Sequence, residues 1–83
     1  MKVEFKQREE MKGLQWRYTT DDNKNSLSIL CHEGSYGWEE GKFETMCSWL
    51  TDVQGHLTFE QVARKIKTIY KLEKDAILGE NDG

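Results

Sequence analysis

Two segments in which apolar and polar residues alternate, separated by a short polar stretch, constrain the fold of this chain most. In residues 14–20 large apolar side chains alternate with polar ones, and Leu27, Ile29 and Cys31 share one face of residues 26–32. Alternation at period two is typical of a strand with one buried face. The five residues between the segments are Asp, Asn and Lys, and Asp and Asn favour turns. The pattern therefore predicts a β-hairpin.

Residues 42–50 fit either a strand or a helix, and periodicity alone does not separate the two. We favour a strand, because a hairpin needs a third strand to cover its apolar face and because Thr, Phe, Cys and Trp suit a pleated surface. The strand would place Phe43, Thr45, Cys47 and Trp49 on one face, and the helix would align Phe43, Met46, Cys47 and Leu50.

The N-terminal segment is also ambiguous. Val3 and Phe5 alternate with charged residues as in a strand, whereas residues 4–12 would also form a short helix. We favour a short strand.

The C-terminal third carries the clearest helix signal. Residues 52–55 predict a turn, and Thr58 then begins a helix as its N-cap, with Gln61 completing a capping box. Leu57 precedes the cap and is placed to pack on Val62. Gly79 predicts the end of the helix, and residues 79–83 are expected to fray. The apolar stripe of this helix would be Phe59, Val62, Ala63, Ile66, Ile69 and Tyr70.

These elements predict a single α+β domain over residues 1–83. A small antiparallel sheet of three to four strands would pack on one C-terminal helix as a two-layer sandwich. We expect the helix to cover the sheet tightly, because 83 residues leave little material for a cavity beside a core.

Composition excludes several functional classes. No apolar run exceeds three residues, so we expect no membrane span, and the charged N-terminus does not resemble a signal peptide; we therefore expect a cytoplasmic protein. A net charge of −3 argues against bulk electrostatic binding of nucleic acid. Two cysteines do not make a disulfide scaffold.

No motif indicates an enzyme, a metal or a cofactor. Cys31, His32, Cys47 and His56 lack the closely spaced pairs of a zinc site, so we expect buried cysteines and surface histidines. Neither cysteine has the neighbouring base that a nucleophile needs. The Gly-rich segment 34–41 contains two carboxylates and no following Lys-Ser/Thr pair, which excludes a phosphate-binding loop.

Two surface features remain as candidate binding sites. In the Gly-rich loop, Tyr36 and Trp38 precede Glu39 and Glu40; aromatic side chains there either anchor a partner or fold back to cap the core. On the helix, basic residues recur on the side opposite the apolar stripe. They form either a contact for an acidic partner or a solvated face with the pairs Glu60–Arg64 and Lys71–Asp75. This basic stripe consists of Arg64, Lys67, Lys71 and Lys74.

The loop and the helix start also resemble a group of small proteins encoded by bacteriophages and prophages. The shared pattern is Ser-Tyr-Gly, acidic residues, Gly, an aromatic and Glu, followed by Asp-Val-x-Gly-x-Leu-Thr. This chain has Ser35-Tyr36-Gly37, Glu39-Glu40-Gly41 and Phe43-Glu44, then Asp52-Val53-Gln54-Gly55-His56-Leu57-Thr58. The resemblance covers residues 33–66 and departs at Trp38, where a small residue is expected. It implies an accessory protein that acts on host proteins and does not specify a mechanism.

The sequence thus predicts a non-enzymatic phage-type accessory protein that binds another protein through Tyr36, Trp38, Glu39 and Glu40, with the basic stripe as a second contact. An alternative is a single-stranded nucleic-acid-binding module that uses the open sheet face, although that face is poor in aromatics and positive charge. A third is a homodimer through the same face. The open face would carry Gln15, Arg17, Thr19, Ser28 and Leu30, with Leu30, Met46 and Leu50 as its apolar surface.

Overall fold

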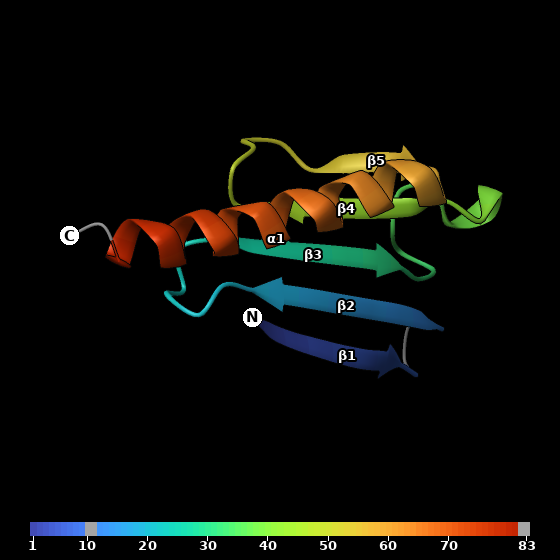
Figure 1. The fold of residues 1–83 in the computed structure, drawn as a ribbon. Helices are drawn as coiled ribbons and strands as arrows, with labels where there is room; N and C mark the ends of the chain where they lie inside the picture. The colour runs from blue at the N-terminus through green and yellow to red at the C-terminus, as the bar shows by residue number, and fades with distance from the viewer. Residues whose placement is uncertain (10–11, 82–83) are drawn as a thin grey trace.

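The computed structural model, which describes residues 1–9 and 12–81, is one antiparallel sheet packed against one C-terminal helix (Figure 1). The strands follow chain order across the sheet, so each pairs with its sequence neighbours. This α+β arrangement agrees with the predicted class. The elements are β1 (Lys2–Arg8), β2 (Gly13–Thr19), β3 (Ser26–Cys31), a short 3-10 turn (Trp38–Glu40), β4 (Phe43–Cys47), β5 (Gln54–Leu57) and α1 (Phe59–Asn81).

The three strand predictions made from the sequence are confirmed. β2 and β3 form the hairpin, with Trp16 opposite Ile29 and Tyr18 opposite Leu27. The N-terminal segment is a strand, and it pairs with β2 along its whole length. The segment after the Gly-rich loop is also a strand, although it ends at Cys47 and leaves Trp49 in the following turn.

The sheet has five strands, so the prediction of three to four strands was wrong. β5 begins within residues 52–55, which were predicted as a turn, and continues to Leu57. Its pairing with β4 matches Phe43 with Leu57 and Thr45 with Gln54, so that Gly55 and His56 both lie opposite Glu44. Such a bulge interrupts the period of two, and His56 takes a positive φ of 56°. The alternation by which a strand is recognised in a sequence is therefore missing here.

The start of α1 confirms the predicted capping box. The Thr58 N–H donates to Gln61 Oε1 at 2.8 Å, and the Gln61 N–H donates to Thr58 Oγ1 at 3.3 Å. The predicted end was wrong, because the helix continues through Gly79 to Asn81. A β-carbon at Gly79 would meet only open space, so the residue is an exposed helix position rather than a cap. Residues 82–83 of the predicted frayed tail lie outside the described residues.

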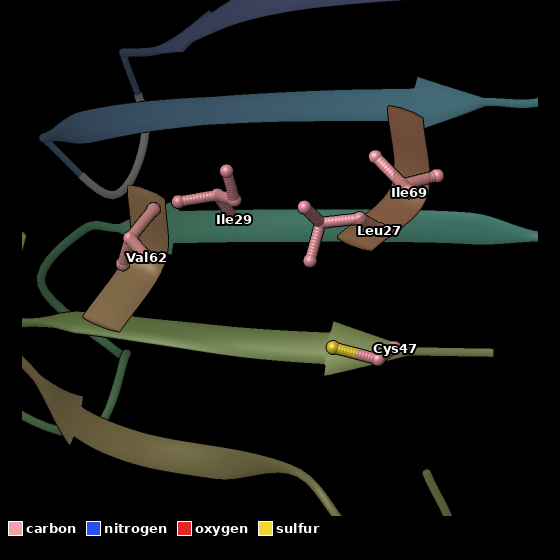
Figure 2. Close-up of a cluster of buried hydrophobic side chains, with 5 residues drawn as sticks. All are labelled: Leu27, Ile29, Cys47, Val62 and Ile69. Atoms are coloured by element: carbon pink, nitrogen blue, oxygen red, sulfur yellow. The ribbon is translucent and has the colours of Figure 1, made fainter. Parts of the chain in front are cut away.

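The core lies between α1 and the middle of the sheet. Leu27 and Ile29 of β3 and Cys47 of β4 point towards Val62 and Ile69 of α1, and all five side chains are buried (Figure 2). The helix accordingly packs on β3 and β4, and β1 and β2 extend beyond it (Figure 1).

One helix is too narrow to cover this sheet. Five strands at a spacing of about 4.8 Å span roughly 19 Å, whereas a helix with its side chains is about 10 Å wide. Val3 and Phe5 of β1 lie on the same face as Trp16, yet they are 51% and 56% exposed, while Lys2, Glu4 and Lys6 point to the opposite face. The expectation of a tight cover was therefore wrong for the β1–β2 half.

The apolar stripe of α1 is correspondingly incomplete. Val62 and Ile69 are buried, but Phe59 is 75% exposed and Tyr70 is 51% exposed. Both were predicted to be part of the stripe. They lie on the flank of the helix that faces β2, where no further element covers them among the described residues.

A polar contact fixes the other end of the helix to the sheet. Glu73 is nearly buried, and its Oε2 accepts a hydrogen bond from the Asp21 N–H at 2.9 Å. The Met1 ammonium lies 2.5 Å from Asp21 Oδ1 and 3.4 Å from Glu73 Oε2. The pKa of this ammonium is raised, chiefly because it donates a hydrogen bond to Asp21. The first residue and the β2–β3 turn are thus both held against α1.

Two fully buried threonines provide a test of the core. Thr45 Oγ1 has no hydrogen-bond partner among the described residues, whereas Thr20 Oγ1 donates to Asp22 Oδ1 at 2.6 Å and accepts from the Asn25 N–H at 3.1 Å. We expect Thr45→Val to raise the free energy of unfolding by up to about 1 kcal/mol, and Thr20→Val to lower it by about 1–3 kcal/mol. Urea denaturation measures both. Equal losses of stability in the two variants would contradict the conclusion that only Thr20 is hydrogen-bonded.

Candidate functional site

An apolar hollow lies between the N-terminal half of α1 and the inner face of β2, β3 and β4. Its volume is about 250 Å³. Alternation along β2 turns Trp16 and Tyr18 towards α1, and helical spacing aligns Phe59, Val62 and Ile66 above them. The lining residues are Trp16, Tyr18, Ile29, Phe43, Phe59, Val62 and Ile66.

Two further aromatic side chains extend this hollow along the sheet. The Phe5 ring lies against Trp16, with ring centroids 5.4 Å apart and the planes inclined at 46°. The Tyr70 ring meets Tyr18 edge to face at 6.3 Å. We call the hollow together with Phe5 and Tyr70 the aromatic groove. Both pairs fall within the range of favourable aromatic contacts, so the rings hold one another in place.

The chemistry of the aromatic groove is that of a contact surface. Among the described residues, its lining carries no carboxylate, imidazole, thiol or amine, and the hydroxyls of Tyr18 and Tyr70 are its only titratable groups. Such a surface releases water when an apolar side chain enters it, at a gain of about 25 cal/mol per Å² of apolar area. It offers no group that would transfer a proton near neutral pH.

The Gly-rich loop is built on tight backbone turns. Gly37 and Gly41 take positive φ values of 100° and 69°, which glycine adopts without steric cost. The buried Ser35 donates its hydroxyl to the His32 carbonyl at 2.7 Å and accepts the His32 N–H at 3.0 Å. The Lys42 N–H closes the loop on the Gly37 carbonyl at 2.9 Å.

The two aromatic residues of this loop lie against different elements. Tyr36 is 65% exposed and lies beside β5, where its carbonyl accepts the His56 N–H at 3.3 Å. Trp38 is half-buried and lines a second hollow, together with Leu14 and Cys31. Tyr36 therefore remains available for contact, whereas Trp38 covers the end of the sheet. The predicted pair does not share one pocket.

The two acidic residues of the loop differ in their ion pairs. Glu39 and Glu40 are both exposed. Glu40 lies 3.0 Å from Lys42 Nζ and 3.2 Å from His56 Nδ1. The pKa of the Glu40 carboxyl is lowered, chiefly by the hydrogen bond from Lys42, with a smaller effect of His56. Part of the charge of Glu40 is therefore already neutralised within the molecule.

The basic stripe follows the solvent-exposed side of α1. Helical spacing turns Arg64 and Lys71 away from the sheet and brings Lys67 and Lys74 nearer the flank that faces β2. The pairs Glu60–Arg64 and Lys71–Asp75, which the solvated-face alternative invokes, do not form ion pairs among the side chains that the structure describes. Arg64 borders a shallow hollow on the β5 side, together with Gln61 and Thr68. The stripe is thus exposed and has no internal carboxylate partner among those side chains. Its members are Arg64, Lys67, Lys71 and Lys74.

The four Cys and His side chains do not converge. His32 is buried, and its Nδ1 accepts the Gly34 N–H at 3.1 Å, so the expectation that it lies at the surface was wrong. His56 is exposed, as expected, and Cys47 is buried. Within residues 1–9 and 12–81, no three His, Cys, Asp or Glu side chains are placed to hold one ion.

The sheet face opposite α1 is polar over most of its area. Gln15 donates to Ser28 Oγ at 3.3 Å, and Arg17 lies next to Ser28 across the β2–β3 pair. Met46 and Leu50 are exposed near one end of this sheet. The aromatic side chains that a base-stacking surface needs lie on the helix side.

Sequence reasoning did not include Phe5, Phe59 and Tyr70 among the site residues. The alternation of β1 did place Phe5 on an apolar face, and helical spacing aligned Phe59 with Tyr70. The missing information was the lateral position of α1 over the sheet, which decides whether that face is covered.

The chain has no match among protein-family models, curated proteins or solved structures. No helix in the described part of the chain has both the length and the apolar character that crossing a membrane requires.

Gly55 allows the loop to approach β5 closely. A β-carbon on Gly55 would lie 2.4 Å from Tyr36 Cβ. We expect Gly55→Ala to lower the free energy of unfolding by about 1–3 kcal/mol, because the loop must move away. Tyr36→Gly removes the clashing atom, so the double variant should lose less than the sum of the single changes. Strictly additive losses in urea denaturation would contradict this contact.

The ion pairs of Glu40 with Lys42 and His56 predict that the stability of the protein depends on pH. Because the Glu40 pKa is lowered in the folded state, its ion pairs contribute stability above the ordinary pKa of a glutamate and lose it as the pH falls through the lowered value. Lys42→Met should raise the Glu40 pKa, and His56→Gln should raise it less. Carbon-13 NMR titration of the Glu40 carboxyl measures both shifts. A larger pKa shift in His56→Gln than in Lys42→Met would contradict the conclusion that Lys42 is the main cause of the lowered pKa.

Proposed function

We propose that this protein is a non-enzymatic accessory protein that acts in the cytoplasm by binding another protein through the aromatic groove. The observation that carries the proposal is the exposure of Phe5, Phe59 and Tyr70 beside an apolar hollow. An 83-residue chain has few large apolar side chains with which to build its core. Leaving three of them more than half exposed on one face is typical of a partner-binding surface.

The character of the residues supports contact rather than catalysis. Aromatic anchors in a pre-formed apolar hollow are the residues that dominate the binding energy of protein interfaces. The rings of Phe5 and Trp16, and of Tyr18 and Tyr70, are already packed in pairs, so little conformational entropy is lost when a partner binds.

The resemblance of residues 33–66 to small phage and prophage proteins supports an accessory role directed at a host protein. In this proposal Tyr36 and Glu39 of the loop and the basic stripe are flanking contacts, and the aromatic groove supplies most of the affinity. Single-stranded nucleic acid is the weaker alternative, because the outer sheet face carries Gln15, Arg17 and Ser28 without an aromatic neighbour on β2 or β3.

Affinity capture from bacterial lysates tests the proposal. The groove variant combines Phe5→Thr with Phe59→Glu; both side chains are more than half exposed, and a glutamate in the first turn of a helix is favourable. We expect this variant to fold and to bind the partner at least about tenfold more weakly, because losing an interface anchor costs about 1.4 kcal/mol or more. The amount of partner captured should fall accordingly.

The matched control changes the loop. Tyr36→Ala with Trp38→Ala should keep most of the capture, with circular dichroism and urea denaturation confirming that each variant is folded. Capture that the loop variant abolishes and the groove variant retains would move the binding surface to the loop. Equal capture by the unmodified protein, the groove variant and the loop variant would show that the aromatic groove is not the binding surface.

A further inference from the structure

The uncovered part of the sheet has the width of one helix. α1 occupies the face above β3 and β4, and β5 lies on its far side, where Lys65 donates to Gln54. The two strands on its near side, β1 and β2, span about 10 Å. A helix with its side chains is also about 10 Å wide, and neighbouring helices pack with axes about 8–10 Å apart. A second helix beside α1 would therefore complete the layer that covers this sheet.

The flank of α1 that would contact such a helix is apolar with two charges. Steps of three and four residues place one row of side chains along this flank, as the contact of Tyr70 with Tyr18 and the place of Phe59 in the hollow show. Lys67 and Lys74 are exposed and lie on either side of Tyr70 in the row. The row is Phe59, Ala63, Lys67, Tyr70, Lys74 and Ile77.

We propose that the occupant of the aromatic groove is an amphipathic α-helix of a partner protein, with carboxylates along the edge that faces Lys67 and Lys74. This inference rests on the proposed function and specifies the partner's chemistry. Large apolar side chains of that helix would fill the hollow against Trp16 and Phe59. Lys67 and Lys74 are seven residues, or two turns, apart, so glutamates or aspartates two turns apart would pair with them. The two lysines have no carboxylate partner among the described side chains.

The same charges argue against a second copy of this chain. The exposed side of α1 carries four basic residues of the stripe against two acidic ones, Glu60 and Asp75. A second α1 in the groove would therefore bring a net positive charge towards Lys67 and Lys74. Like charges facing one another across an interface oppose association. An acidic-edged helix has the complementary sign.

The dimensions limit the length of the helix. β1 has 7 residues at about 3.3 Å each, so the sheet surface beneath the bound helix is roughly 23 Å long. At 1.5 Å per residue, a helix of about 15 residues spans this distance.

Two synthetic peptides of this length test the inference on the full chain. Both carry leucines at helical spacing on one face; one has glutamates along an edge, and the other has lysines at the same positions. We expect the glutamate peptide to bind about tenfold more tightly at low salt, because two rim pairs each contribute modestly, and the difference to shrink at high salt. Fluorescence anisotropy measures the affinities, and NMR shifts of the Trp16 indole and Tyr70 ring locate the site.

Charge-reversed variants supply the matched control. Lys67→Glu with Lys74→Glu should reverse the preference between the two peptides. Arg64→Glu with Lys71→Glu changes the net charge equally on the side of α1 away from the groove, so the preference should be largely retained.

The outcomes separate the two proposals. If lysate capture depends on Phe5 and Phe59 but neither peptide binds, or both bind equally, the inference fails and the proposed function stands. If capture does not depend on those residues, and the glutamate peptide does not bind in the groove, both fail. Binding of oligothymidylate that requires Phe5 and Phe59, or a concentration-dependent mass that Lys67→Glu alters, would also overturn the helical occupant.

Discussion

The ratio of one helix to five strands determines most of what this molecule presents to solvent. A single helix buries the inner face of about two strands, and the described residues include no second layer over β1 and β2. Since β1 and β2 nevertheless carry Phe5, Trp16 and Tyr18 on that face, part of the apolar surface remains outside the core. The core and the candidate binding surface are therefore two halves of one continuous apolar face.

The lateral position of α1 is set from both ends. Val62 and Ile69 pack on Leu27 and Ile29 over the centre of the sheet, and Glu73 accepts a hydrogen bond from the β2–β3 turn. These contacts keep the helix from sliding over β2, where it would bury Tyr18 and close the groove. The packing of the core and the Glu73 hydrogen bond thus offset the unfavourable free energy of the exposed aromatic surface.

Local signals in the sequence were sufficient for the hairpin and for the capping box at Thr58, because both depend on residues close in sequence. The strand after the Gly-rich loop also required the argument that a hairpin needs a third strand. β5 was missed because a bulge at Gly55 and His56 breaks its alternation. The groove was missed because helical spacing determines which residues share a side of α1, whereas only tertiary packing determines how far that side reaches. The loop residues were identified from composition, which left open whether Trp38 anchors a partner or folds back; in the structure Trp38 shares a hollow with Leu14 and Cys31.

The two outermost strands also bear on aggregation. An unprotected strand edge is a template for pairing with another chain, and an aromatic residue such as Phe5 would strengthen such stacking. β1 carries Lys2, Glu4 and Lys6 on its outer face, and β5 is short and distorted at His56. Alternating charge on one edge and irregular geometry on the other oppose the growth of fibrils. The aromatic rings are therefore exposed on a sheet whose two edges both resist pairing with another chain.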